Sequence, residues 1–162
     1  MKKKVLSIFA VILIALSCFT PTNVFASETP IDEYINFEVP TSRISSNGNF
    51  TFNVHRSLKS GSFTANGTSI TIQTRARIYH LGYDTYRTSK NVKFQVVLYK
   101  SGGTRVGSYT GMADNIYGGK EFTGLKKGAT YYFEILVLDE DIQHSAVESI
   151  KGSGNVSGAT IK

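Results

Sequence analysis

The chain has 162 residues, a single cysteine, no tryptophan and a formal net charge of +6. The cysteine, Cys18, lies in an N-terminal stretch that resembles a secretion signal, so an exported chain would have no disulfide, thiolate metal site or cysteine nucleophile. Losing that stretch also removes three lysines, which leaves fifteen basic against twelve acidic residues. The basic residues that remain are scattered from Arg43 to Lys162. We therefore expect no nucleic-acid or other polyanion partner.

Residues 1–26 have the three parts of a secretion signal. Three lysines precede an apolar run from Val5 to Phe19, and Val24-Phe25-Ala26 supplies short side chains before the bond between Ala26 and Ser27. The run is shorter than the roughly 20 residues of a spanning helix. We expect cleavage between Ala26 and Ser27, no stable membrane span, and secretion from a Gram-positive bacterium. The alternative is a lipid-anchored precursor cut before Cys18, although the preceding residues match such a motif poorly.

The rest of the chain has a length suited to one domain. We expect residues 27–45 to form an N-terminal segment with a first edge strand, which alternates weakly from Tyr34 to Val39. Residues 46–162 are expected to form a β-sandwich domain.

The clearest strand extends from Ile70 to Tyr79, where apolar and polar residues alternate with period two. Asn66-Gly67 precedes it, a pair that favours a two-residue type I′ turn. The sequence therefore predicts a hairpin that pairs Phe63 with Ile70 and places both on the same face.

Further alternating segments complete a pattern without any helical periodicity. Tyr131 to Leu138 is expected to be a central strand, whereas the glycine-interrupted segments Ala146 to Ile150 and Asn155 to Ile161 are expected to form a final hairpin at an edge. The other predicted strands are Phe50 to His55, Val92 to Tyr99 and Arg105 to Thr110. This pattern predicts an all-β fold, a single antiparallel sandwich of the immunoglobulin-like or jelly-roll-like kind with about seven to nine strands.

One segment carries a family resemblance. Leu125 precedes Tyr131 by six residues, and Phe133, Ile135 and Val137 continue at alternate positions. The segment resembles the corner between the fifth and sixth strands of fibronectin type III and related immunoglobulin-like sandwiches. The resemblance implies that the Tyr131 hydroxyl bonds to the backbone of the turn that starts at Leu125.

The candidate binding residues gather in two loops. The segment from Tyr79 to Arg87 is rich in tyrosine, whose ring stacks on sugar faces, and the loop from Gly111 to Lys120 adds another tyrosine. Whether the two loops meet is left open by the sequence. The alternative is that the tyrosines merely cap the sandwich. The candidate ligand-binding residues are Tyr79, Tyr83, Asp84, Tyr86, Arg87 and Tyr117.

Arg75 and Arg77 alternate on the polar side of the strand from Ile70 to Tyr79. They are interpreted either as contacts for an anion or uronic acid or, in the interpretation that we favour here, as charges that protect the sheet from unwanted pairing.

Metal and catalytic sites are weakly indicated. Asp139 and Asp141 lie in an acidic run that is the best candidate for calcium, but such a run is more often a solvated turn. The histidines lack zinc-binding spacing. Glu121 and Glu134 lie in neighbouring strand regions and could supply the carboxylate pair of a glycoside hydrolase, but any β protein with twelve acidic residues offers such pairs. We expect no metal, no cofactor and no enzyme activity.

These features favour a secreted, non-enzymatic β-sandwich that binds a cell-envelope or extracellular-matrix component such as a glycan. The alternative is a secreted effector or toxin-like protein that self-assembles or acts on a target membrane. The sequence leaves the oligomeric state open.

Overall fold

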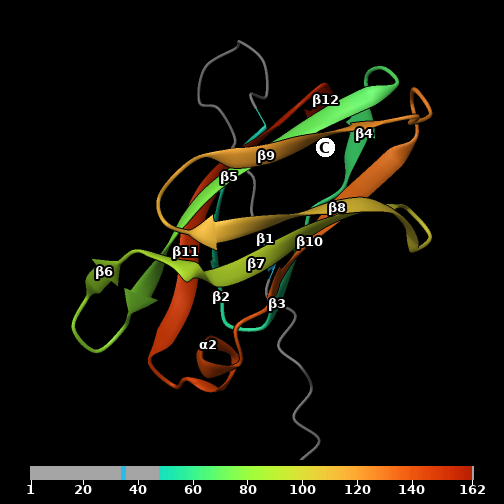
Figure 1. Ribbon diagram of the computed structural model, residues 1–162. Coiled ribbons are helices and arrows are strands. Elements are labelled where there is room, and N and C mark those ends of the chain that lie inside the picture. Colours follow the sequence, from blue (N-terminus) through green and yellow to red (C-terminus); the bar gives the residue numbers. More distant parts are fainter. Residues whose placement is uncertain (1–33, 36–47, 162) are drawn as a thin grey trace, which may run out of the picture. The chain divides into compact units, whose positions relative to one another are not determined.

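Twelve strands and one short helix make up the described part of the chain, residues 34–35 and 48–161 of a computed structural model. The strands form a seven-stranded sheet, here sheet A, and a five-stranded sheet, sheet B, which face each other (Figure 1). The predicted all-β sandwich is confirmed, but the strands outnumber the expectation because several have only two to four residues. The predicted cleavage bond between Ala26 and Ser27, and the predicted strand residues 36–39, lie outside the described residues.

Sheet A is built around β10. One side of β10 pairs with β7, which pairs in turn with β8, while its other side is shared by β4 and β3. β12 pairs with β4, and β1 runs parallel to β3, whereas the other described pairs are antiparallel. The strands of sheet A are β1 (Tyr34–Ile35), β3 (Ser57–Ser60), β4 (Phe63–Ala65), β7 (Ser89–Lys100), β8 (Thr104–Ala113), β10 (Thr130–Val137) and β12 (Ala159–Ile161). The prediction that the segment from Tyr131 forms a central strand is confirmed.

Sheet B has β11 between β2 and β5. Three segments follow one another along the other edge of β5: β9 pairs with its first half, Asp114 forms a bridge with Arg77, and β6 pairs with its last residues. The strands of sheet B are β2 (Asn49–Val54), β5 (Ser69–His80), β6 (Thr85–Arg87), β9 (Gly118–Thr123) and β11 (Glu148–Ser157).

The core lies between the sheets and is filled by the residues that alternate inward. In β5 the residues Ile70, Ile72, Thr74, Ala76 and Ile78 are buried, as their period of two predicts. Phenylalanine rings join the two layers, with Phe50 of sheet B 4.9 Å from Phe133 of sheet A, between ring centroids. The same alternation confirms the strands predicted around Phe50 and Val92.

The predicted hairpin at Asn66-Gly67 is wrong. Phe63 belongs to sheet A and Ile70 to sheet B, and neither Asn66 nor Gly67 has the positive φ of a type I′ turn. The backbone N–H of Asn66 instead donates to Gly158 O over 2.9 Å. Phe63 and Ile70 both point into the core, so their alternation fits opposing sheets as well as it fits a hairpin.

The final hairpin is also predicted wrongly, because β11 is one continuous ten-residue strand in the middle of sheet B. Its glycines provide space. A Cβ at Gly152 would lie 2.5 Å from Phe52 Cζ, and one at Gly154 would press on the ring of Phe50. The two glycines therefore let phenylalanines of β2 lie across β11 without breaking the strand.

The turn between β9 and β10 connects the two sheets. Leu125 is buried there, and the backbone N–H of Lys126 donates to the Tyr131 hydroxyl over 2.9 Å. Gly124 and Gly128 take positive φ angles on either side of this bond. The turn therefore contains the hydrogen bond that the resemblance implies for Tyr131.

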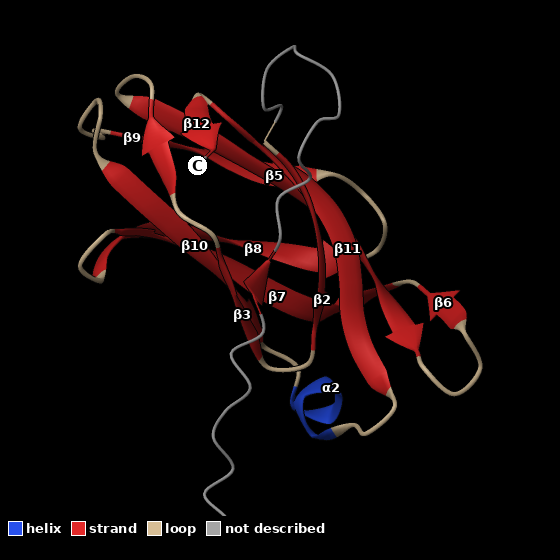
Figure 2. Ribbon diagram, turned by 180° about the vertical axis from the view of Figure 1, so that it is seen from behind, coloured by secondary structure: helices blue, strands red, loops and turns tan. Residues whose placement is uncertain are grey.

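The acidic run after β10 begins the short helix α2 (Glu140–His144), a helix that the sequence did not predict. The Asp139 carboxylate accepts a hydrogen bond from the Ile142 backbone N–H over 3.1 Å and so caps the helix. Asp141 lies in the first turn, where negative charge is favourable. α2 contacts β10 and β11 at one end of the sandwich, seen below β11 in Figure 2.

Candidate functional site

The hairpin formed by β5 and β6 contains five of the six predicted binding residues. Tyr79 pairs with Tyr86 across the hairpin, and Tyr83 and Asp84 lie in the turn between the strands. Neighbouring residues of a strand point to opposite faces, and Ile78 points into the core. Tyr79 and Tyr86 therefore lie on the outer face of sheet B.

Tyr79 and Asp84 bind each other. The Tyr79 hydroxyl donates to Asp84 Oδ1 over 3.0 Å, and Asp84 reaches it from a turn in which its φ is 48°. This hydrogen bond raises the pKa of Tyr79 above its ordinary value. The ring of Tyr79 also lies 5.1 Å from that of Tyr86, between centroids. Asp84 thus positions a tyrosine of the face.

Arg87 and Tyr83 are separated from this pair. Arg87 Nη2 donates to both carboxylate oxygens of Glu148, at 3.0 and 2.8 Å, and this bonding raises the pKa of Arg87. Tyr83 is 77% exposed and contacts the His80 ring, 4.6 Å between centroids. Arg87 and His80 alternate with Tyr86 and Tyr79, so both lie on the opposite side of the hairpin. The structure therefore divides the predicted group between two faces.

Two further cations join the tyrosine pair. β11 pairs with β5 so that Lys151 is directly opposite Arg77. Lys151 Nζ lies 4.4 Å from the ring centroid of Tyr79, and Arg77 Cζ lies 4.8 Å from that of Tyr86. A hydrogen bond with Tyr86 raises the pKa of Lys151. The two cations thus lie against neighbouring aromatic rings of one face.

Arg75 extends this group toward the second predicted loop. Its Cζ lies 4.9 Å from the ring centroid of Tyr117, and its Nε donates to Ser153 Oγ over 3.5 Å. The loop reaches β5 through the Asn115 backbone N–H, which donates to Ala76 O over 2.8 Å. Both predicted loops therefore contribute to one surface along β5. We call the set Arg75, Arg77, Tyr79, Tyr86, Tyr117 and Lys151 the cationic face.

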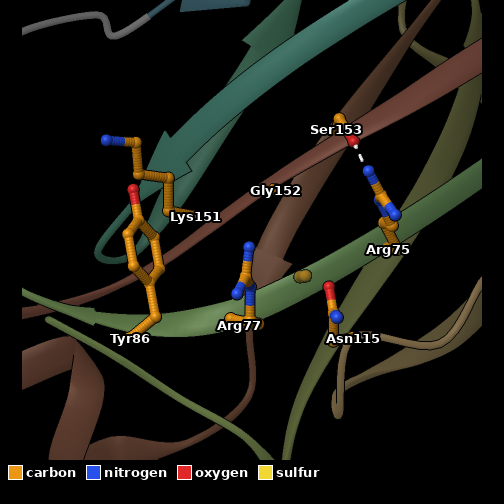
Figure 3. A pocket seen from close by; sticks show the side chains of 8 residues that line it. Arg75, Arg77, Tyr86, Asn115, Lys151, Gly152 and Ser153 are labelled. Atoms are coloured by element: carbon orange, nitrogen blue, oxygen red, sulfur yellow. Dashed lines mark hydrogen bonds between the residues drawn. The ribbon is translucent and has the colours of Figure 1, made fainter.

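A shallow groove of about 180 Å³ crosses the cationic face. Figure 3 shows Arg77 between Tyr86 and Asn115, with Arg75 joined to Ser153 at the other end of the groove. Gly152 contributes only backbone to the groove wall, because its alpha carbon faces inward toward Phe52. The lining residues are Arg75, Ala76, Arg77, Tyr86, Asn115, Lys151, Gly152 and Ser153.

The groove carries three positive charges, and no acidic residue lines it. Among the described residues, one ion pair has a nitrogen–oxygen distance below 4.0 Å, and it joins Arg87 to Glu148. Asp114 pairs with Arg77 through the backbone, but its carboxylate accepts from the Ile116 N–H over 3.0 Å. The groove can therefore offer guanidinium and ammonium donors to a negatively charged ligand.

The other candidate sites are not assembled. Glu121 of β9 points outward from sheet B and Glu134 of β10 points outward from sheet A, so the two carboxylates lie on opposite sides of the sandwich. Within residues 34–35 and 48–161 no three histidine, cysteine or acidic side chains are grouped to hold a metal ion. No helix in this described part is long and apolar enough to span a membrane.

Sequence reasoning missed Lys151 and Ser153, whereas Asn115 lies in the loop from Gly111 to Lys120 that the sequence marks as a candidate. Lys151 is 74 positions away from Arg77, and nothing local marks it as a neighbour. The alternation of Arg75 with Arg77 was the available signal, since it places both on one outer face. The basic residues were expected to be scattered, but Arg75, Arg77 and Lys151 are brought together in the folded protein.

Compared with known proteins, the chain matches no family model, and a search of curated proteins finds no significant relative.

Proposed function

We propose that this chain is an exported, non-catalytic β-sandwich that binds a glycan or a similar polymer of the cell envelope or extracellular matrix on its cationic face. The observation that carries the proposal is the cationic face with its groove, which combines tyrosine rings, three cations and polar side chains on one outer sheet face. Aromatic rings pack against the C–H faces of sugars, while the charged and amide groups bind their polar substituents.

The flatness of the face supports a polymer as the ligand. Outward-pointing Asn155 and Gln73, which are paired between β11 and β5, continue the face beyond the groove. A small ligand would be poorly enclosed by so shallow a surface, whereas an extended chain would contact several of these residues in turn. Binding energy would then come from repeated weak contacts.

Retention on insoluble cell-wall material tests this proposal. Tyr86→Ala removes a ring from the groove, and we expect it to weaken retention about tenfold. Tyr83→Ala is the matched control, because Tyr83 is exposed in the same hairpin but contacts His80 on the other side. Loss of retention by the Tyr83 variant alone, or by neither variant, would contradict the proposal.

A second readout addresses the absence of catalysis. The same wall material is incubated with the protein and the supernatant is analysed for soluble sugar fragments. We expect none above the blank. Release of fragments that depends on the protein would show an enzyme instead.

A further inference from the structure

The starting observation is a like-charge pair. Lys151 and Arg77 are directly opposite each other in the antiparallel ladder of β11 and β5, and Arg75 follows two residues along β5. Like charges in this arrangement repel each other and destabilise a sheet. None of the three forms an ion pair within 4.0 Å of a described carboxylate. The folded protein therefore concentrates three cations that lack an ion-pair partner among the described residues, although the Asp84 carboxylate still acts on Lys151 electrostatically.

Aromatic rings hold these cations in place. Lys151 lies against Tyr79, Arg77 against Tyr86, and Arg75 against Tyr117, each with its charged group 4.4 to 4.9 Å from a ring centroid. Cation–π contacts restrain a side chain while its N–H groups stay available for a ligand. Such restraint lowers the entropy lost on binding.

The spacing of the cations suits several negative groups in succession. Residues two apart in a strand lie about 7 Å from each other, and facing residues of neighbouring strands lie about 5 Å apart. The charged ends of Lys151, Arg77 and Arg75 thus form successive positive points along the groove, with the Tyr86 ring between those of Lys151 and Arg77 (Figure 3). Ser153 and Asn115 lie beside these points and can bind hydroxyl groups.

We infer that the ligand is a polyanionic, hydroxyl-rich polymer whose carboxylate or phosphate oxygens bind Arg75, Arg77 and Lys151. The inference rests on the proposed function and specifies the charge of the ligand. Three cations are few for a nucleic acid, which needs a longer basic stripe to neutralise its closely spaced phosphates. The row of small polar side chains also matches a polyhydroxylated chain better than stacked bases.

Binding of soluble polymers by the whole protein tests the inference. Polygalacturonate supplies carboxylates, poly(glycerol phosphate) supplies phosphates, and a neutral glucan of similar length supplies neither. We expect binding to at least one anionic polymer and at least tenfold weaker binding to the glucan. Three charge contacts predict a slope of about −2 for log affinity against log salt concentration, by analogy with single-stranded polyanions.

Charge variants assign the effect to the groove. We expect Arg77→Gln and Lys151→Gln each to lower the affinity for the anionic polymer about tenfold. Arg77→Lys keeps a positive charge and should bind more tightly than Arg77→Gln. Lys127→Gln is the control, because Lys127 is exposed in the turn between β9 and β10. Each groove variant removes one charge of the like-charge pair but also one cation–π contact, so we expect its urea midpoint to stay close to that of the wild type. A variant that unfolds at a lower urea concentration than the wild type is not used. The dependence of wild-type binding on salt concentration then tests the inference.

Each outcome has a definite meaning. Equal binding of glucan and polyanion, with Tyr86 still required, overturns the inference and leaves the proposed function standing. Failure to bind wall material and every polymer overturns both. Tighter binding of an oligonucleotide, or of anionic lipid vesicles, than of either polymer also overturns the inference. The inference is also overturned if Lys127→Gln weakens binding as much as the groove variants do.

Discussion

Replacing Gly152 by alanine tests whether β11 is continuous because its glycines make room for aromatic rings. The new Cβ would lie 2.5 Å from Phe52 Cζ and directly against the carbonyl oxygen of Arg75. Carbon atoms pack best at about 3.5 to 4 Å, so the ring would have to move by about 1 Å. The carbonyl belongs to the ladder of β5 with β11 and cannot move without disturbing it.

Overpacking of this kind costs about 1 to 3 kcal/mol, partly offset by the lower entropy of the unfolded alanine chain. We expect the free energy of unfolding to fall by about 2 kcal/mol, which corresponds to a Tm lower by roughly 8 °C. Gly107→Ala is the matched control, since its Cβ would meet Phe122 Cδ1 at an ordinary 3.4 Å. We expect that variant to change stability by less than about 0.5 kcal/mol.

Urea unfolding followed by circular dichroism measures the difference, provided that the m value stays constant. Adding Phe52→Leu to the Gly152 variant should recover part of the loss, because the ring that causes the clash is gone. Equal urea midpoints for the Gly152 and Gly107 variants would refute the reasoning.

Three further predictions concern single side chains. Tyr131→Phe leaves the Lys126 N–H without its partner and should cost about 1 kcal/mol in urea unfolding. Tyr132→Phe should not, because the contacts of Tyr132 with Tyr99 and Lys59 are made by its ring, which the substitution keeps. Asp139→Ala removes the cap of α2 and should cost about 1 kcal/mol, which is measured as faster amide hydrogen exchange in the helix. Asp139→Asn should retain most of the cap, so equal exchange rates in the two variants would contradict the capping role of Asp139. Burial raises the pKa of Tyr109 to about 12, so the stability that it contributes is complete below pH 10 and is lost as the pH rises through 12. Tyr109→Phe should therefore flatten the alkaline decrease in urea midpoint, and an unchanged decrease would contradict the assignment.

The strands with clear alternation were predictable because one face of each is buried. β5, β7 and β10 follow this rule, and their inward residues are those that the sequence indicates. Pairing was less predictable. Asn66-Gly67 has the composition of a tight turn, yet the sequence does not show that β4 pairs with β10 and β12 in the opposite sheet. In a sandwich both arrangements place the same residues in the core.

Two local errors have a packing cause. The glycines of β11 resemble interruptions, because the rings that require them, Phe50 and Phe52, come from a strand about 100 positions earlier. The run that starts at Asp139 resembles a solvated turn, because α2 is too short to show a helical pattern and depends on its cap. In both cases the decisive partner is invisible to local periodicity.

The candidate site was predictable in part. The tyrosines at positions 79, 86 and 117 do lie on one face, and the alternation of Arg75 with Arg77 indicated that both point outward. The contribution of Lys151 depends on the register between β11 and β5, which sequence patterning does not fix. Register is therefore what changes scattered charges into a concentrated positive surface.

Mapping the ligand contact by amide chemical shifts tests the central claim most directly. On addition of cell-wall polymer to isotope-labelled protein, we expect the largest changes at residues 75–77, 86, 115 and 151–153, which form and surround the groove. Changes confined to the hairpin turn at residues 81–84, or to the outer face of sheet A, would contradict the assignment of the cationic face as the binding surface.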